Sequence, residues 1–394
     1  MTQSKACSST LSSAAPVEFN VPNTALGRSA SHLLAQAGIE VNGPRPWDMQ
    51  LHAPGVVERV FSQGSLGLGE AYMEGMWSAR HLDQFFYRIL RSGLDEEIRS
   101  TRFLLHALLT RFTNRQGKRQ SRHAIAAHYD LGNDFYAAML DSRMTYTCGY
   151  WHDATTLDAA QEAKLDLICR KLQLQPGMRL LDIGCGWGSL MAYAAEHYQV
   201  ECVGATLSRS QAEWATERYA DTRMRFLLQD YRDLTGQFDA IASVGMFEHV
   251  GRKNYRTFFE VAHRLLAPDG LFLLHTIGKN SHRGGSDPWM DRYIFPGGDL
   301  PSAAQISCAA DGLFIIEDLH SFGADYDRTL MAWCANFDRA WDRFADRYDP
   351  HFYRMWKYYL LSCAGAFRAR SIQLWQWVLS KNGLDGGYRI ENVL

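Results

Sequence analysis

The chain has 394 residues, of which 46% are hydrophobic and 21% charged, and its formal net charge at pH 7 is -2. This length exceeds the usual size of one compact domain, so two domains with a large apolar core are expected. The small net charge excludes a strongly basic nucleic-acid binder as a description of the whole chain.

Cysteine and apolar patterns predict the cellular setting. The eight cysteines form no C-x-x-C pair and show no metal-ligand spacing, so we expect no metal and a reduced, cytoplasmic compartment. The N-terminus has only Lys5 as an early positive charge and no long apolar segment, so no signal peptide is expected. No apolar run reaches the roughly 18 residues of a spanning helix, so any membrane contact would be peripheral.

The first third of the chain divides by composition. Residues 1–30 are rich in small and polar residues and are expected to be a flexible tail. Residues 31–110 are expected to form a small mixed α/β domain. Its last apolar segment, 103–109, would dock on a membrane, pack inside the protein or form a dimer contact. A basic linker, 111–122, is either solvated or contacts anionic lipid. The catalytic domain is expected at 123–394.

Apolar segments alternate with helical stretches in this second domain. Strands are predicted at 179–183, 200–205, 223–229, 238–243, 270–275 and 313–319, and helices at 158–172, 189–198 and 208–219. The aromatic-rich region 326–379 is predicted to form long helices. This alternation predicts an α/β fold with a mostly parallel sheet that is covered on both faces. Ligands of such sheets bind at the carboxyl ends of the strands.

A glycine loop follows the first predicted strand. Gly184, Gly186 and Gly188 stand at alternate positions, the first of them two residues after Asp182, and a helix follows. Such a loop lets a ligand approach bare backbone at the positive end of a helix. The spacing differs from the G-x-G-x-x-G of dinucleotide folds, and a carboxylate would repel a pyrophosphate. The loop therefore favours S-adenosylmethionine, with a dinucleotide or plain close packing as alternatives.

The next two strands lead to further candidate cofactor residues. The second strand lacks the acidic residue usual for ribose recognition, so Thr206, Ser208 or Gln211 must supply those hydrogen bonds. Ser208 also stands where an N-cap would begin the following helix. A polar and aromatic cluster follows the third strand, where an adenine could lie. The candidates in this region are Thr206, Leu207, Ser208, Gln211, Tyr231 and Arg232.

Several further motifs occur in order between about residues 123 and 380. They are AHYDLGND at 127–134, YTCGYW at 146–151, GMFEHVG at 245–251, LHTIG at 274–278, YIFPGG at 293–298, FGADY at 322–326 and CAGAFRAR at 363–370. Together with the glycine loop they resemble the cyclopropane-fatty-acyl-phospholipid synthases, and they are similar to mycolic acid cyclopropane synthases. The family's usual Tyr-Ser-Cys-Ala-Tyr is Tyr-Thr-Cys-Gly-Tyr here, which keeps the hydroxyl and loses one methyl group.

The resemblance implies a Rossmann-like S-adenosylmethionine-dependent methyltransferase fold. It implies transfer of a methylene group from S-adenosylmethionine to the cis double bond of an unsaturated phospholipid acyl chain. Methyl transfer leaves a carbocation, and a bound bicarbonate is implied as the base that removes a proton from the transferred methyl. The resemblance also implies a homodimer, without nucleic acid, in peripheral contact with the inner face of the membrane.

The resemblance also implies the residues of the site. The bicarbonate would be held by Cys148, Glu248, His275, Ile277 and Tyr326, with backbone donors from Ile277 and Cys148. Tyr146 and Thr147 are expected at the cofactor, and Cys363 is either a direct participant or a buried cysteine.

The residue types suit this chemistry, because His275 and Tyr326 can donate hydrogen bonds to an anion and Glu248 can accept a proton. Taken singly, each has a structural alternative: a core histidine, a solvated glutamate and a packed tyrosine. Two other functions compete: a methyltransferase that acts on an amine or stops at a methyl branch, and a non-catalytic cofactor-binding or lipid-surface module. A proton-removing set argues against both.

Overall fold

The computed structural model describes residues 23–94, 131–219, 221–282 and 285–389. The apolar segment 103–109 and the basic linker 111–122 lie outside these ranges. In the part of the chain that is described, no helix combines the length and apolarity needed to cross a bilayer. All seven cysteines within these ranges are free thiols.

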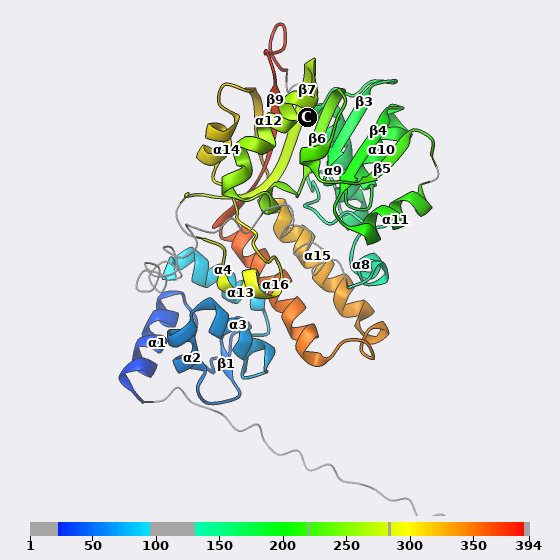
Figure 1. Cartoon of the computed structure of the whole chain (residues 1–394). Helices are drawn as coiled ribbons and strands as arrows, with labels where there is room; N and C mark the ends of the chain where they lie inside the picture. Colours follow the sequence, from blue (N-terminus) through cyan, green and yellow to red (C-terminus); the bar gives the residue numbers. More distant parts are fainter. Residues whose placement is uncertain (1–22, 95–130, 220, 283–284, 390–394) are drawn as a thin grey trace, which may run out of the picture.

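A seven-stranded sheet forms the centre of the catalytic domain (Figure 1). Its strands are, in spatial order, β5 (Met224–Leu228), β4 (Glu201–Thr206), β3 (Arg179–Ile183), β6 (Phe238–Val244), β7 (Leu266–Lys279), β9 (Ile372–Ser380) and β8 (Ile315–Ser321). Neighbours from β5 to β7 are parallel, whereas β9 is antiparallel to both β7 and β8. The mostly parallel sheet is confirmed, and all six predicted strands are present.

Helices cover both faces of this sheet. The helices α9 (Leu157–Lys171), α10 (Ser189–Tyr198) and α11 (Arg209–Arg218) confirm the three predicted ones to within one residue at each end. On one face α9 and α10 pack in a cluster that contains Leu180. The next residue of β3, Leu181, belongs to a cluster with α12 (Tyr255–Leu265) and α14 (Ala303–Ala310). Successive residues of a strand face opposite sides, so both faces are buried. The remaining helices of this half are α8 (Asn133–Met139) and α13 (Pro288–Tyr293), with short 3-10 turns η1 (Tyr231–Asp233), η2 (Phe247–His249), η3 (Arg252–Asn254) and η4 (Trp341–Arg343).

The C-terminal region corrects one prediction. It begins with two long helices, α15 (Ala324–Ala340) and α16 (Pro350–Arg368), but residues 372–379 lie in strand β9 and not in a helix. β9 is inserted between β7 and β8, and nearly all of its residues are buried. A strand buried on both faces shows no alternation of apolar and polar residues, so periodicity cannot distinguish it from a buried helix.

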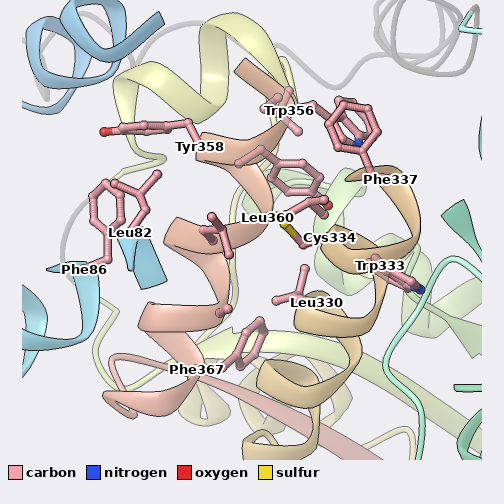
Figure 2. Packing of buried hydrophobic residues seen from close by; sticks show 14 of the residues in the cluster. Leu82, Phe86, Leu330, Trp333, Cys334, Phe337, Trp356, Tyr358, Leu360 and Phe367 are labelled. Atoms are coloured by element: carbon pink, nitrogen blue, oxygen red, sulfur yellow. The ribbon is translucent and has the colours of Figure 1, made fainter. Parts of the chain in front are cut away.

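The N-terminal region is mainly helical and shares its core with α15 and α16. Its elements are α1 (Ala25–Gln36), β1 (Gln50–Leu51), α2 (Val56–Gln63), α3 (Ser65–Met73), β2 (Trp77–Ser78) and α4 (Leu82–Ser92). Within the tail expected at residues 1–30, Thr24 caps a helix that begins at Ala25. Figure 2 shows Leu82 and Phe86 of α4 on one side of α16 and the side chains of α15 on its other side.

Two features of α16 hold α4 in close contact. A side chain at Gly365 would overlap the carbonyl of Asp83 and the Cβ of Phe86, so the glycine lets the helices approach. Three residues further on, Arg368 bonds Asp83 at 2.6 Å and Asp327 of α15 at 2.8 Å. Arg368 therefore joins α4, α15 and α16 through ion pairs.

The contact at Gly365 can be tested by overpacking. Gly365→Val places three carbons against the backbone of α4 and should lower the free energy of unfolding by about 1–3 kcal/mol. Ala335→Val adds a β-branched side chain at an exposed position of α15 and should change it by only about 0.5 kcal/mol. Urea unfolding of both variants makes the comparison. Equal stability of the two would show that α4 does not pack as described.

Candidate active site

A cleft opens at the carboxyl ends of β3, β4 and β6. Its volume, including the open mouth, is about 1160 Å³. Ten of the twelve predicted cofactor residues line it, namely Tyr146, Thr147, Asp182, Gly184, Gly186, Thr206, Leu207, Gln211, Tyr231 and Arg232. This is where an open, mostly parallel sheet binds its ligand.

The glycine loop forms one wall of the cleft. Gly184, Gly186 and Gly188 have φ angles of 87°, 54° and 84°, a left-handed conformation that glycine adopts without steric cost. Gly188 does not line the cleft. It caps α10, and a side chain there would overlap the ring of Phe226. The third glycine therefore shapes the strand-to-helix turn, while the first two expose backbone to a ligand.

Asp182 is buried beside a lysine that the sequence analysis did not single out. The side chain of Lys164, on α9, is buried and donates to the hydroxyl of Thr147 at 2.9 Å. Burial raises the pKa of Asp182 to about 7, an effect that the charge of Lys164 opposes. Burial also lowers the pKa of Lys164 to about 8. One oxygen of Asp182 is buried and has no hydrogen-bond partner within the described part of the chain. A carboxylate in this state suits a cationic ligand.

The turn after β4 divides its polar groups between ligand and structure. Thr206 donates to Gln211 at 3.0 Å and accepts from the backbone of Ser208 at 3.1 Å. The Ser208 hydroxyl accepts a hydrogen bond from the backbone N–H of Gln211 and so caps α11. This is the N-cap role that the sequence offered as the alternative to ribose binding. Ser208 does not line the cleft, so only Thr206, Leu207 and Gln211 are available to a ligand at this turn.

An ion pair forms the wall beyond β5. Arg232 donates to both oxygens of Asp230, at 2.8 and 2.7 Å, and both residues line the cleft. Tyr231 lines it too, with the guanidinium of Arg232 over its ring. The predicted polar and aromatic cluster lines the cleft, and Asp230 is an additional acidic member.

A second group of residues lies at the ends of β6 and β7. Glu248, in η2 after β6, accepts a hydrogen bond at 2.7 Å from the backbone N–H of Ile277. That donor was expected to face an anion, but here it orients the carboxylate instead. Burial raises the pKa of Glu248 to about 7, and its second oxygen is buried without a partner in the described ranges.

The side chain of His275 lies in the same buried region. Its side chain is 1% exposed, and burial lowers its pKa well below the usual value, so the ring is neutral. Its Nδ1 lies 3.2 Å from the amide nitrogen of Gln376, while its Nε2 is buried and bonds no other described residue. An unpaired buried nitrogen is not what a satisfied core histidine shows.

Tyr326 completes this group from the first turn of α15. Burial raises the pKa of its hydroxyl well above the usual range, and the nearby Cys148 and Glu248 act in the same direction. The Cys148 thiol is fully buried and donates to the carbonyl of Gly149. Cys363, on α16, also raises the pKa of Tyr326. Burial raises the pKa of the Cys363 thiol itself to about 12. A thiol in that state is a poor nucleophile.

Some cleft residues were missed in the sequence. Lys164 and Trp187 line the cleft, as does His249, whose pKa burial lowers to about 4. Lys164 sits among ordinary helical residues, where a lysine normally faces solvent. His249 and Trp187 belong to motifs already noted, and that was the only available signal. Within the described ranges, no group of three or more His, Cys, Asp or Glu side chains could hold a metal ion.

Comparison with solved structures defines the class of protein. A mycolic acid cyclopropane synthase in complex with SAH and CTAB is 38% identical with a TM-score of 0.62, covering 66% of this chain and 98% of that one. Coclaurine N-methyltransferase, 23% identical, shares the fold with a TM-score of 0.66 over 80% of this chain and 99% of its own. The fold is that of S-adenosylmethionine-dependent methyltransferases.

Comparison of sequences narrows the class to a family. Residues 116–377 match the family described as mycolic acid cyclopropane synthetase. The cyclopropane-fatty-acyl-phospholipid synthase of Escherichia coli K12 is 51% identical over 96% of this chain and 100% of its own length. A tuberculostearic acid methyltransferase of Mycobacterium tuberculosis is 33% identical over 92% of this chain and 91% of its own. The chain belongs to the cyclopropane synthase family of methyltransferases.

The charge of Lys164 should tune cofactor affinity. Lys164→Met removes the cation that opposes the effect of burial, so the pKa of Asp182 rises further and its carboxyl becomes neutral at neutral pH. The Kd for S-adenosylmethionine, measured by titration calorimetry, should rise about 10-fold.

A second buried lysine of α9 provides the control. Lys171 pairs with Asp318 at 2.8 Å and does not line the cleft. Lys171→Met should lower the melting temperature and leave the Kd within about twofold of wild type. An unchanged Kd in Lys164→Met would contradict the role given to the lysine.

Proposed function

We propose that this protein transfers a methylene group from S-adenosylmethionine to the cis double bond of an unsaturated phospholipid acyl chain, forming a cyclopropane ring. The observation that carries the proposal is a buried proton-handling group beside the cofactor cleft. Glu248 and Cys148 are close enough to affect Tyr326, and His275 stands two residues before the Ile277 whose N–H bonds Glu248. Plain methyl transfer to an amine would not need such a group. The family relationship supports the same reaction class.

The cleft residues suit the cofactor. S-adenosylmethionine supplies an electrophilic methyl group, and the acyl double bond is the nucleophile, so no protein nucleophile is needed. Asp182 would balance the positive charge of the cofactor, and Thr206 and Gln211 offer hydrogen bonds for its sugar. This chemistry leaves Cys363 without a covalent role, in agreement with its buried thiol.

An aromatic wall suits a carbocation. Tyr326 stacks on Phe367 with ring centroids 4.5 Å apart and meets Trp333 edge to face. Tyr146 also contacts Trp333 and lies 3.0 Å from Tyr359 between hydroxyl oxygens. Aromatic faces stabilise positive charge, and their packing excludes the water that would otherwise capture a carbocation.

The polar residues fit a bicarbonate ion. The buried Nε2 of His275, when protonated, and the Tyr326 hydroxyl can donate hydrogen bonds, and the unpaired oxygen of Glu248 can accept one from the hydroxyl of the anion. These three, with Cys148, would hold it, and when bound it would supply the base that takes a proton from the transferred methyl. Ile277 acts one step away, by orienting Glu248.

The substrate is reached from a lipid surface. We infer an unsaturated phospholipid presented by a bilayer, with peripheral docking on the inner face of the membrane and assembly as a homodimer. The family relationship supports the lipid substrate, since the E. coli relative is named for a phospholipid. Segments 103–109 and 111–122, the candidates for docking, lie outside the described residues.

One alternative keeps the same fold and cofactor. The relative from Mycobacterium tuberculosis is named a methyltransferase, so a branched product is a real competitor to a ring. The two outcomes differ in whether a proton leaves the transferred methyl. The buried group around Glu248 favours the ring.

Product analysis tests the proposed function. Purified protein is incubated with S-adenosylmethionine and vesicles of unsaturated phospholipid, in buffer with and without added bicarbonate after removal of carbon dioxide. We expect fatty acids that gain one methylene unit and lose the double bond, at a rate that falls when bicarbonate is absent. A branched or unchanged fatty acid would refute the ring-forming reaction, and an unaffected rate would refute bicarbonate as the base.

The pH dependence should follow Glu248. Below its pKa of about 7 the Glu248 carboxyl is protonated and cannot accept a proton, whereas above this pKa it is ionised and can. The kcat at saturating cofactor should therefore rise with pH through about 7. Glu248→Gln should lower kcat by about 100- to 10,000-fold and remove this limb. The control is Glu260→Gln, at an exposed position of α12, which should retain the wild-type kcat and its rise with pH. A limb that persists in Glu248→Gln would assign it to another group.

A further inference from the structure

Three polar side chains form a row across the sheet beside the candidate active site. In the strand register, Gln376 of β9 pairs with His275 of β7 on one side and with His320 of β8 on the other. Paired residues on neighbouring strands project to the same face of a sheet. The neighbours of Gln376 in β9 are all apolar: Leu374, Trp375, Trp377 and Val378. A glutamine in the middle of such a strand therefore calls for an explanation.

The hydrogen bond to His275 supplies one. The Gln376 side chain is completely buried, and its amide nitrogen lies 3.2 Å from Nδ1 of His275. An amide nitrogen only donates, so Nδ1 must accept. The buried ring is neutral and carries a single proton, which must then be on Nε2. That Nε2 is the buried atom without a partner in the described part of the chain.

We propose that Gln376 is a positioning residue that holds His275 in the tautomer with its proton on Nε2. The proposal deepens the proposed function and rests on it. It assigns His275 as a hydrogen-bond donor to the anion and excludes the ring as the acceptor of the methyl proton. The proton that the anion takes from the methyl must then pass to Glu248, the proton acceptor among these side chains.

Stability does not account for this amide. The oxygen of Gln376 is buried without a partner in the described ranges, as is Nδ1 of His320 on the other side of the row. A buried, unpaired polar atom costs about 1–3 kcal/mol. An apolar side chain of similar shape would avoid that cost, so the amide is explained by its effect on His275.

Nitrogen NMR reads the tautomer directly. Protein labelled with ¹⁵N-histidine gives long-range nitrogen–proton correlations, and His275→Asn identifies the signal of His275 among the 14 histidines. We expect a proton on Nε2 and none on Nδ1 in the wild type. Gln376→Glu replaces the donor with a carboxylate that only accepts, so Nδ1 should become protonated. A wild-type proton on Nδ1 would overturn the proposal.

Enzyme kinetics measure how the hydrogen bond from Gln376 to His275 affects catalysis. Gln376→Met keeps the shape and removes the donor, so kcat should fall about 10- to 100-fold while KM for S-adenosylmethionine stays within about twofold. The control is Gln373→Met. Gln373 is a buried glutamine of the same strand that bonds Asn280 and Arg370 and, at an odd offset, faces the other side of the sheet. It should keep the wild-type kcat.

The two readouts separate two kinds of failure. An unchanged kcat in Gln376→Met, or an equal loss in Gln373→Met, would overturn the positioning role even with a normal product. Absence of a cyclopropane product from the wild type would refute the proposed function. The tautomer in the wild type and in Gln376→Glu would then still decide whether Gln376 sets the state of His275.

Discussion

Removal of water from the carboxyl ends of β3, β6 and β7 is the constraint on which the site depends. Asp182 lies near the end of β3, Glu248 follows β6, and His275 lies in β7 beside the last residue of β6, and their exposed fractions are only 2%, 8% and 1%. Burial disfavours the charged form of each group, so the carboxyl pKa values rise towards 7 and the imidazole stays neutral. The same dryness that makes these groups sensitive to protons would protect a carbocation from water.

The C-terminal region builds the second half of the site. α15 contributes Tyr326, α16 contributes Tyr359 to the aromatic wall, and β9 places Gln376 against His275. The N-terminal helices pack on the opposite side of α16, in the same hydrophobic cluster as Tyr326 (Figures 1 and 2). α4 therefore packs on the helix that supplies Tyr359 to the aromatic wall.

Local spacing made the cofactor half predictable. The glycine loop, the strand ends around it and helices α9 to α11 follow from patterns within a few residues, which is why ten of the twelve predicted cofactor residues line the cleft. Features that depend on partners distant in sequence were not predictable. Examples are the strand at Gln376, the buried Lys164 and the use of the Ile277 N–H by Glu248. The sequence left Ser208 as either a ribose ligand or an N-cap, and only the hydrogen bond from Gln211 to its hydroxyl identifies the cap.

We propose that the site delivers a methyl group and then takes a proton from it. The most direct measurement uses S-adenosylmethionine with a trideuterated methyl group and unsaturated phospholipid vesicles, followed by mass spectrometry of the fatty acids. Loss of one deuteron on ring closure predicts a saturated, cyclopropane-containing product that retains two deuterium atoms. A product that retains all three would show methyl transfer without proton removal from that methyl, and it would contradict the account.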